Sequence, residues 1–193
     1  MKHLKFRNSL GFTLVELMVV ISIIGIMSSI LYVNYSDARE QARDKVRMTD
    51  LKSLQLAIET YKAQYGRYPA AGCSGGTDFV GPGPESMSGF LGNCDTYITG
   101  HAGGVTFTPD FISVLPRDSR SETENEKGFY YKTDADGTSY KLMVYDSVER
   151  LFITSYSDEF ARCPKTGDAC SGPKPTDANS KTYAVYSNGA ADW

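Results

Sequence analysis

Residues 17–36 form a run of twenty positions without a single charged side chain. A helix that rises ~1.5 Å per residue needs about twenty apolar residues to cross a bilayer. Glu16 lies at the head of this run, and an ionised carboxylate deep in a bilayer costs roughly 3 kcal/mol or more unless it is paired. The run therefore predicts a membrane-spanning helix, and Glu16 is expected to have a cationic partner.

A chain cut between Gly11 and Phe12 would supply that partner, because the new ammonium group would lie four residues before Glu16. Its charge would neutralise the carboxylate of the same or a neighbouring chain. The segment before the cut is short and basic, with Lys2, Lys5 and Arg7 and no acidic residue.

The string GFTLVE at residues 11–16, after this basic leader, resembles the prepilin processing signal of type IV pilins and of the pseudopilins of type II secretion systems. In that family a membrane peptidase cuts after the glycine and methylates the new terminal phenylalanine. The resemblance thus assigns cleavage and N-methylation to Gly11 and Phe12, and subunit docking to Glu16. One departure is Val33, which stands where the family usually has a proline and leaves open whether the helix loosens there.

The leader also bears on orientation and partners. Its three cations predict an N-terminus in the cytoplasm and a C-terminal domain outside it, in a single-pass inner-membrane protein. Removing residues 1–11 changes the formal charge from −3 to −6, because the leader holds no acid. Without a basic surface to attract phosphates, nucleic acid is not an expected partner.

An ordinary secretory signal peptide is the simpler alternative for the N-terminus, and residues 36–38 have a small-x-small cleavage pattern. The apolar run is longer than the roughly 7–15 residues of such a signal, and Glu16 interrupts its head. An uncut anchor is a further alternative, but it leaves the position of Glu16 unexplained.

Four cysteines follow the membrane segment, on the side where disulfides persist: Cys73, Cys94, Cys163 and Cys170. Four cysteines allow three pairings. We expect Cys73 with Cys94 and Cys163 with Cys170, since each pair closes a loop rich in Gly, Pro and Ser. A zinc site is the competing interpretation, but there is no C-x-x-C spacing, and the chain has only two histidines.

Beyond the apolar run, hydrophobic residues recur every three to five positions up to Tyr65. Neither Pro nor Gly occurs at residues 26–65, so one continuous helix is predicted from Phe12 to Tyr65, ~81 Å long at ~1.5 Å per residue. We divide it into a membrane or filament-core half at 12–36 and an amphipathic half at 37–65. The charged side chains at 39–47 are interpreted as a solvated surface, with ion pairs between subunits as a secondary hypothesis.

Residues 66–193 are expected to form an extracytoplasmic globular head. Its first part, 66–104, is rich in Gly and Pro and is read as a disulfide-stapled loop. Two prolines at 109 and 116 predict a short helix over 108–116. Residues 151–156 fit a strand or a short helix equally well.

Two segments rich in aromatic and β-branched residues, 128–133 and 139–145, flank the turn sequence at 134–138 and predict an antiparallel hairpin. Residues 182–187 predict a terminal strand. The expected fold class is α+β and pilin-like: a long N-terminal helix packed on a small antiparallel sheet, with Tyr140, Leu142 and Val144 facing the helix.

No catalytic constellation is present in the sequence. His101 is the only histidine outside the leader, and it lies in a glycine-rich context unsuited to holding a base. Asp134 and Asp136 invite a calcium interpretation, but the ligand spacing of a calcium loop is missing and a hairpin turn explains them. We expect no enzyme activity, no cofactor and no metal, with calcium kept as a minor alternative.

These features predict a structural subunit of a type IV pilus or of a type II secretion pseudopilus. The resemblance implies four partners: copies of the chain itself and other pilins, the prepilin peptidase and methyltransferase, an assembly ATPase, and an inner-membrane platform. The alternative is an anchored extracytoplasmic binding or enzymatic domain that never polymerises.

Overall fold

The computed structural model describes residues 11–73, 78–83, 89–101, 105–122, 124, 127–163, 175, 180–191 and 193, with the backbone alone at 30–34 and 122. The chain divides into two compact units, Met1–Arg39 and Glu40–Trp193. The second unit contains the whole sheet and the hydrophobic core.

The main helix, α1, runs from Leu14 to Tyr65 without a break, as the absence of Pro and Gly from residues 26–65 predicted. It ends at Gly66, which adopts a φ of 76° and donates its N–H to the carbonyl of Lys62 at 2.7 Å. Glycine reaches this left-handed conformation without a Cβ clash, and it is a common way to stop a helix. The long continuous helix is therefore confirmed.

The predicted hairpin is confirmed as β5 (Gly128–Thr133) and β6 (Tyr140–Tyr145), which pair antiparallel over six residues. The terminal strand is confirmed as β7 (Tyr183–Tyr186), which pairs antiparallel with β6. In the turn between β5 and β6, the carboxylate of Asp134 accepts hydrogen bonds from the backbone N–H and the hydroxyl of Thr138. This acid therefore has the turn role expected from the sequence.

The segment 66–104 is more ordered than the predicted loop. Its β2 (Phe79–Val80) pairs antiparallel with β5, and its β3 (Phe90–Leu91) pairs parallel with β2. The five-stranded sheet thus has the order β3-β2-β5-β6-β7. A separate two-stranded ladder joins β1 (Ala70–Ala71) to β4 (Ile98–Thr99). Two-residue strands are too short to show the alternation of apolar and polar residues that indicates a strand, so no sequence pattern predicted them.

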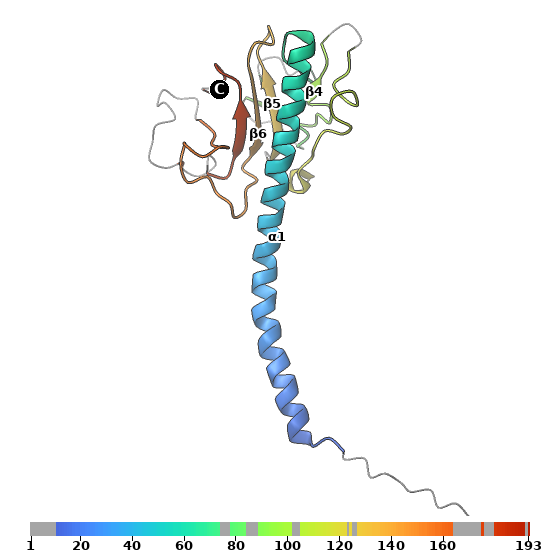
Figure 1. Cartoon of the computed structure of the whole chain (residues 1–193), viewed down its shortest axis with the longest axis vertical. Coiled ribbons are helices and arrows are strands. Elements are labelled where there is room, and N and C mark those ends of the chain that lie inside the picture. The colour runs from blue at the N-terminus through green and yellow to red at the C-terminus, as the bar shows by residue number, and fades with distance from the viewer. Residues whose placement is uncertain are drawn as a thin grey trace, which may run out of the picture. The chain divides into compact units, whose positions relative to one another are not determined.

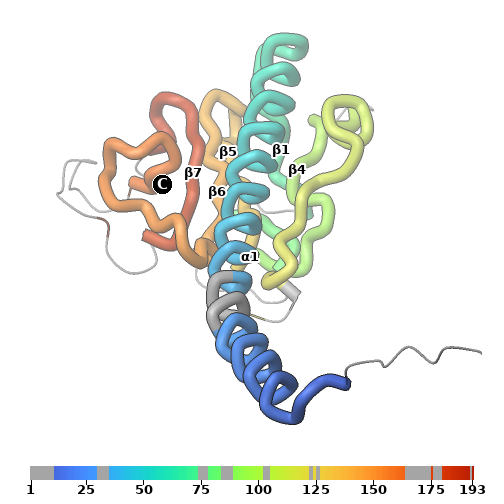
Figure 2. Tube along the Cα trace, turned by 60° about the horizontal axis from the view of Figure 1, so that its bottom comes forward, coloured from blue at the N-terminus to red at the C-terminus, as the bar shows by residue number. Residues whose placement is uncertain are grey.

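Residues of α1 beyond Glu40 lie across one face of the sheet, and β1 and β4 lie on the other side of the helix from β7 (Figures 1 and 2). The core between helix and sheet contains the predicted helix stripe and the predicted face of β6: Leu51, Leu54, Ile58, Tyr61, Tyr140, Leu142 and Val144. The alternate residues Tyr130, Met143 and Ala184 join a second cluster with Phe79 and Phe90. Successive side chains of a strand point to opposite faces, so one sheet serves both clusters. The α+β class is confirmed.

Two local predictions are wrong. Residues 108–116 form a turn and not a helix, with a single helical-type hydrogen bond from Phe111 N–H to the Phe107 carbonyl. Both rings pack against Tyr61 of α1 at centroid distances of 6.0 and 5.1 Å, so tertiary packing outweighs the helix signals of the two prolines. Residues 151–156 are neither strand nor helix. The N–H of Ile153 instead donates a hydrogen bond to the carbonyl of Ser180.

Candidate functional site

The bond expected to be cleaved, between Gly11 and Phe12, lies in non-helical chain just before α1. Both residues are exposed, Phe12 by 81%. A peptidase needs an accessible peptide outside regular secondary structure, and this segment has both properties. The Gly11–Phe12 position is thus sterically compatible with the cleavage assigned by resemblance.

Glu16 closes a reciprocal hydrogen-bonded box with Thr13 at the start of α1. Its carboxylate accepts from the Thr13 backbone N–H at 2.9 Å and from the Thr13 hydroxyl at 2.7 Å, while the Glu16 N–H donates back to that hydroxyl oxygen at 3.2 Å. This is a capping box, with a Thr at the N-cap and a Glu three residues later. The Thr-x-x-Glu spacing carries the signal for this role, which was not among the expectations drawn from the sequence. The carboxylate is directed back toward the N-terminal end of the helix.

The first part of α1 exposes an unusual amount of apolar surface. Every large hydrophobic side chain described between residues 12 and 27 is exposed by 46–81%: Phe12, Leu14, Val15, Leu17, Met18, Val19, Val20, Ile21, Ile23, Ile24, Ile26 and Met27. The hydroxyl of Ser22 donates to the Met18 carbonyl and adds no free polar group. Within the described part of the chain, no helix is both long enough and apolar enough to cross a membrane.

The second unit contains a buried ion cluster that joins α1 to two loops. Arg47 is 4% exposed and donates to Asp118 at 2.5 Å, to Asp44 at 2.7 Å and to Glu149 at 2.8 Å. Arg43 donates to the same Glu149 carboxylate. The pairing with Arg43, followed by that with Arg47, lowers the pKa of Glu149 to about 2. The cluster is charged and fully hydrogen-bonded, which a buried ion network requires.

Asp44 is fully buried and accepts backbone N–H groups from Glu149, Arg150 and Leu151 at 2.8–3.1 Å. One carboxylate on the helix thus holds the loop after β6. The prediction of a solvated charged surface is wrong for Asp44 and Arg47, because loops distant in sequence cover this part of α1. Burial of polar residues leaves no signal in helical periodicity.

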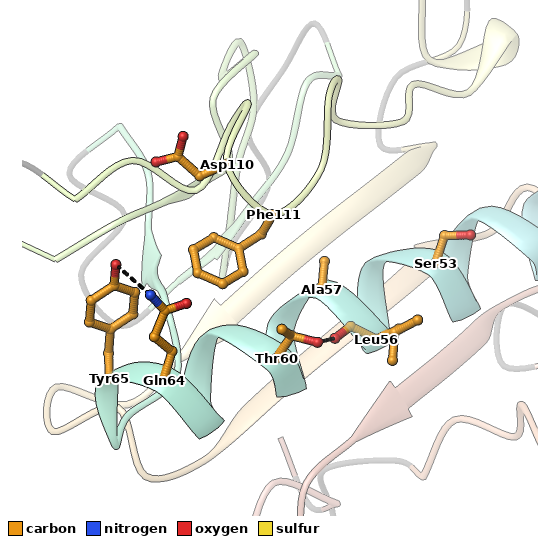
Figure 3. Close-up of a pocket in the computed structure, with 8 residues that line it drawn as sticks. All are labelled: Ser53, Leu56, Ala57, Thr60, Gln64, Tyr65, Asp110 and Phe111. Atoms are coloured by element: carbon orange, nitrogen blue, oxygen red, sulfur yellow. Dashed lines mark hydrogen bonds between the residues drawn. The ribbon is translucent and has the colours of Figure 1, made fainter.

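An open groove of about 550 Å³ runs along the last four turns of α1, beneath the turn that carries Phe111 (Figure 3). Leu56, 70% exposed, and Thr60 lie on its helix side. Thr60 donates its hydroxyl to the Leu56 carbonyl at 2.7 Å. Among the described residues that line the groove, Asp110 is the only one with a carboxylate, and its side chain accepts from Thr106. Within the part of the lining that the structure describes, no nucleophile is paired with a base.

Cys73 and Cys94 form a disulfide that closes a loop with a sequence separation of 21. Gly72 beside it is tightly enclosed, since a Cβ there would lie 1.8 Å from the Thr96 carbonyl oxygen. Cys163 is also disulfide-bonded, whereas its predicted partner Cys170 lies outside the described residues. Among the described residues, no group of His, Cys, Asp and Glu is arranged to hold a metal ion.

Comparison with known proteins begins with residues 6–32, which match the family described as the prokaryotic N-terminal methylation motif. The chain is also similar to type II secretion system core protein G of Aeromonas hydrophila, with 40% identity over 33% of this chain and 44% of that protein. The same protein of Vibrio cholerae is 38% identical over 34% of this chain and 44% of its own length. The chain thus spans less than half the length of these relatives.

A longer similarity connects the chain to the type IV wide pilus major component PilA4 of Thermus thermophilus. The two are 35% identical over 112 residues, which cover 54% of this chain and 85% of the relative. The chain belongs to the type IV pilin and pseudopilin family. Membership confirms the resemblance carried by residues 11–16 and agrees with the pilin-like α+β fold. No solved structure matches this chain.

Proposed function

We propose that this chain is a structural subunit of an extracytoplasmic filament and has no catalytic role. The observation that carries the proposal is the start of the chain's long helix, where large apolar side chains at residues 12–27 are exposed on both sides of Glu16, which is held by Thr13. In a soluble monomer such a surface has no apolar cover. It suits a segment that lies first in lipid and then among the helices of neighbouring copies.

In this proposal residues 1–11 are a leader that a prepilin peptidase removes, and Phe12 becomes the N-methylated N-terminus. Residues 12–36 anchor the subunit in the inner membrane and later pack in the filament core. Residues 37–65 carry the head, residues 66–193, outside the cytoplasm. An assembly ATPase and an inner-membrane platform would supply the work of moving the apolar segment out of lipid.

Glu16 would act in docking. Its carboxylate already points toward the N-terminal end of α1, where it accepts hydrogen bonds from Thr13. After cleavage the ammonium of Phe12 on a neighbouring copy would be the charged partner of the same group. A charge pair in an apolar surrounding is favourable only when both charges are present, so it selects correctly placed neighbours.

The mature N-terminus is the direct test. Mass spectrometry of the subunit from its own cells should find an N-methylated Phe12, and Gly11→Leu should leave Met1 in place. An intact Met1, or a start at Arg39, in the wild-type protein would contradict processing and favour an anchored domain that does not polymerise.

A second experiment separates docking from processing. Glu16→Val should be cleaved and inserted but absent from sheared filaments, and Glu16→Asp serves as the conservative control. Normal filaments from Glu16→Val would rule out the docking role.

Deleting the gene distinguishes the two filament types. A pseudopilus subunit is needed for protein secretion, whereas a pilus subunit is needed for surface fibres.

A further inference from the structure

A second groove, of about 340 Å³, lies beside α1 in the unit Glu40–Trp193. Its helix wall is formed by Ala42, Val46 and Asp50, spaced four residues apart and therefore on one face of the helix. Phe129 at the start of β5 lines the opposite side. Val46 is 58% exposed. The groove thus combines uncovered apolar surface with an acid, Asp50, on its helix wall.

Asp50 differs from the other acids around this groove. It is partly buried, and burial raises the pKa of its carboxyl group. Among the residues that the structure describes, no donor and no cation contacts it. The buried Tyr97 hydroxyl donates to the Pro116 carbonyl and not to this acid. A partly buried carboxylate without a partner is unfavourable, and a cation from outside the subunit would relieve that cost.

The three arginines that line the groove do not neutralise Asp50, because each is bound elsewhere. Arg43 pairs with Glu149, Arg47 with Asp118, and Arg117 with Asp95 at 2.6 Å. Two acids line the groove, Asp50 and Asp118: Arg47 binds Asp118, whereas no ion pair of the described residues engages Asp50. Because each arginine already has a carboxylate, Asp50 is the acid of the lining whose charge is left unbalanced, and this favours a basic occupant.

Lys45 is a cation on the described part of α1 whose position fits. It is exposed, and no ion pair engages its ammonium group in the described part of the structure. It lies five residues before Asp50, which places it roughly 140° around the helix at ~100° per residue. Copies that point the same way along a filament contact each other through two different sides of the subunit. Arg39 lies eleven residues before Asp50 and therefore on nearly the same side of α1. It cannot pair with Asp50 of a copy that points the same way, because such a contact needs two different sides.

We propose that the groove beside Asp50 receives the Lys45 side chain of a second copy of this chain. The lysine stem covers Val46 and Ala42, and its ammonium group pairs with the Asp50 carboxylate, as long basic side chains do on apolar surfaces. The contact is heterologous, so it repeats from copy to copy and builds an open filament. The inference rests on the proposed filament function and names one contact within it.

A charge swap in the full-length protein tests the contact. Asp50→Lys and Lys45→Asp should each reduce the subunit recovered in sheared filaments by about ten-fold, since each places like charges together. The double variant should regain most of the wild-type yield. Asp50→Lys combined with Arg39→Asp is the matched control and should stay low. Retention of the Cys73–Cys94 disulfide in each variant shows that the head is folded.

Wild-type yield from both single variants, or no recovery in the double variant, would overturn the contact and leave the proposed function standing. Absence of filaments from the wild-type protein would overturn both. Cysteine cross-linking gives a second readout: Lys45→Cys with Asp50→Cys should give a ladder of multimers on a non-reducing gel. Those two positions face different sides of one helix and cannot join within a subunit. The contact would also be refuted if Lys45→Cys formed a ladder of multimers with Asp146→Cys and formed none with Asp50→Cys.

Discussion

Arg47 on α1 and Asp118, 71 residues further along the chain, are joined by two hydrogen bonds of 2.5 and 3.1 Å in the buried part of the head. The same guanidinium also binds Asp44 one turn earlier on the helix. This arginine therefore connects the helix to the loop that precedes η1 (Ser119–Glu122). It fixes that loop more firmly than exposed ion pairs would, because water does not screen it.

Removal of this guanidinium should destabilise the head. Arg47→Met keeps most of the side-chain volume but leaves Asp44 and Asp118 as buried carboxylates without their cation, at a cost of about 3–5 kcal/mol. Urea unfolding of the full chain in detergent, followed by near-UV circular dichroism, measures the loss. Lys45→Met, at an exposed lysine, is the control and should change the free energy of unfolding by less than about 0.5 kcal/mol. An equal effect of the two substitutions would contradict the role of the cluster.

Glu149 should make stability fall in acid. Its pKa is about 2 in the folded protein because Arg43 and Arg47 bind the carboxylate, against an ordinary value of 4.5. A group with a lowered folded pKa stabilises fully above its unfolded pKa and loses that contribution as pH falls through the folded pKa. The free energy of unfolding should therefore drop between about pH 4.5 and pH 2. Glu149→Gln should be less stable at pH 7 and show a shallower decline over that window, and unchanged pH slopes would count against the assignment.

Two leucines on α1 offer a matched pair for core packing. Leu54 is fully buried against the sheet, whereas Leu56 is 70% exposed in the groove of Figure 3. Leu54→Ala should cost about 2–5 kcal/mol because it removes buried methyl groups and leaves a cavity. Leu56→Ala should stay within about 0.5 kcal/mol. Thermal unfolding of the two variants gives the comparison, and similar losses would mean that the helix does not face the sheet as described.

The disulfide between Cys73 and Cys94 should contribute roughly 2–4 kcal/mol, mainly by restricting the unfolded chain. Cys73→Ser with Cys94→Ala should lower the midpoint of urea unfolding accordingly. Reductant should destabilise the wild-type protein more than this variant, since the variant has already lost one of the bonds. A variant as stable as the wild-type protein would show that β1 to β4 are held by packing alone.

Local signals predicted the elements whose cause is local. The helix from Leu14 to Tyr65 follows from a stretch without Pro, with no Gly beyond Gly25, and from the stop at Gly66. The hairpin of β5 and β6 follows from two aromatic strands around the turn at Asp134. The capping contact of Glu16 with Thr13 was also readable from their spacing, but it was overlooked.

Elements that depend on distant residues were missed or misread. The strands β2 and β3 exist because Val80 pairs with Tyr131 of β5, and Phe79 stacks on Phe90 at 5.2 Å. The turn at Phe107 follows the ring packing on Tyr61 and not the prolines at 109 and 116 that come after it. None of these partners is close in sequence, so no window of residues contains the cause.

The amino-acid sequence alone was sufficient for the continuous helix, its capping pair, the hairpin and the family, because each depends on residues a few positions apart. Tertiary structure alone decided which charges on α1 meet water. Asp44 and Arg47 are buried by Asp118 and Glu149 from remote loops, whereas Lys45 between them stays exposed. Helix geometry places all three on one turn, but burial depends on which loops cover each side, and a charge is stable in the interior only where those loops bring its counterion.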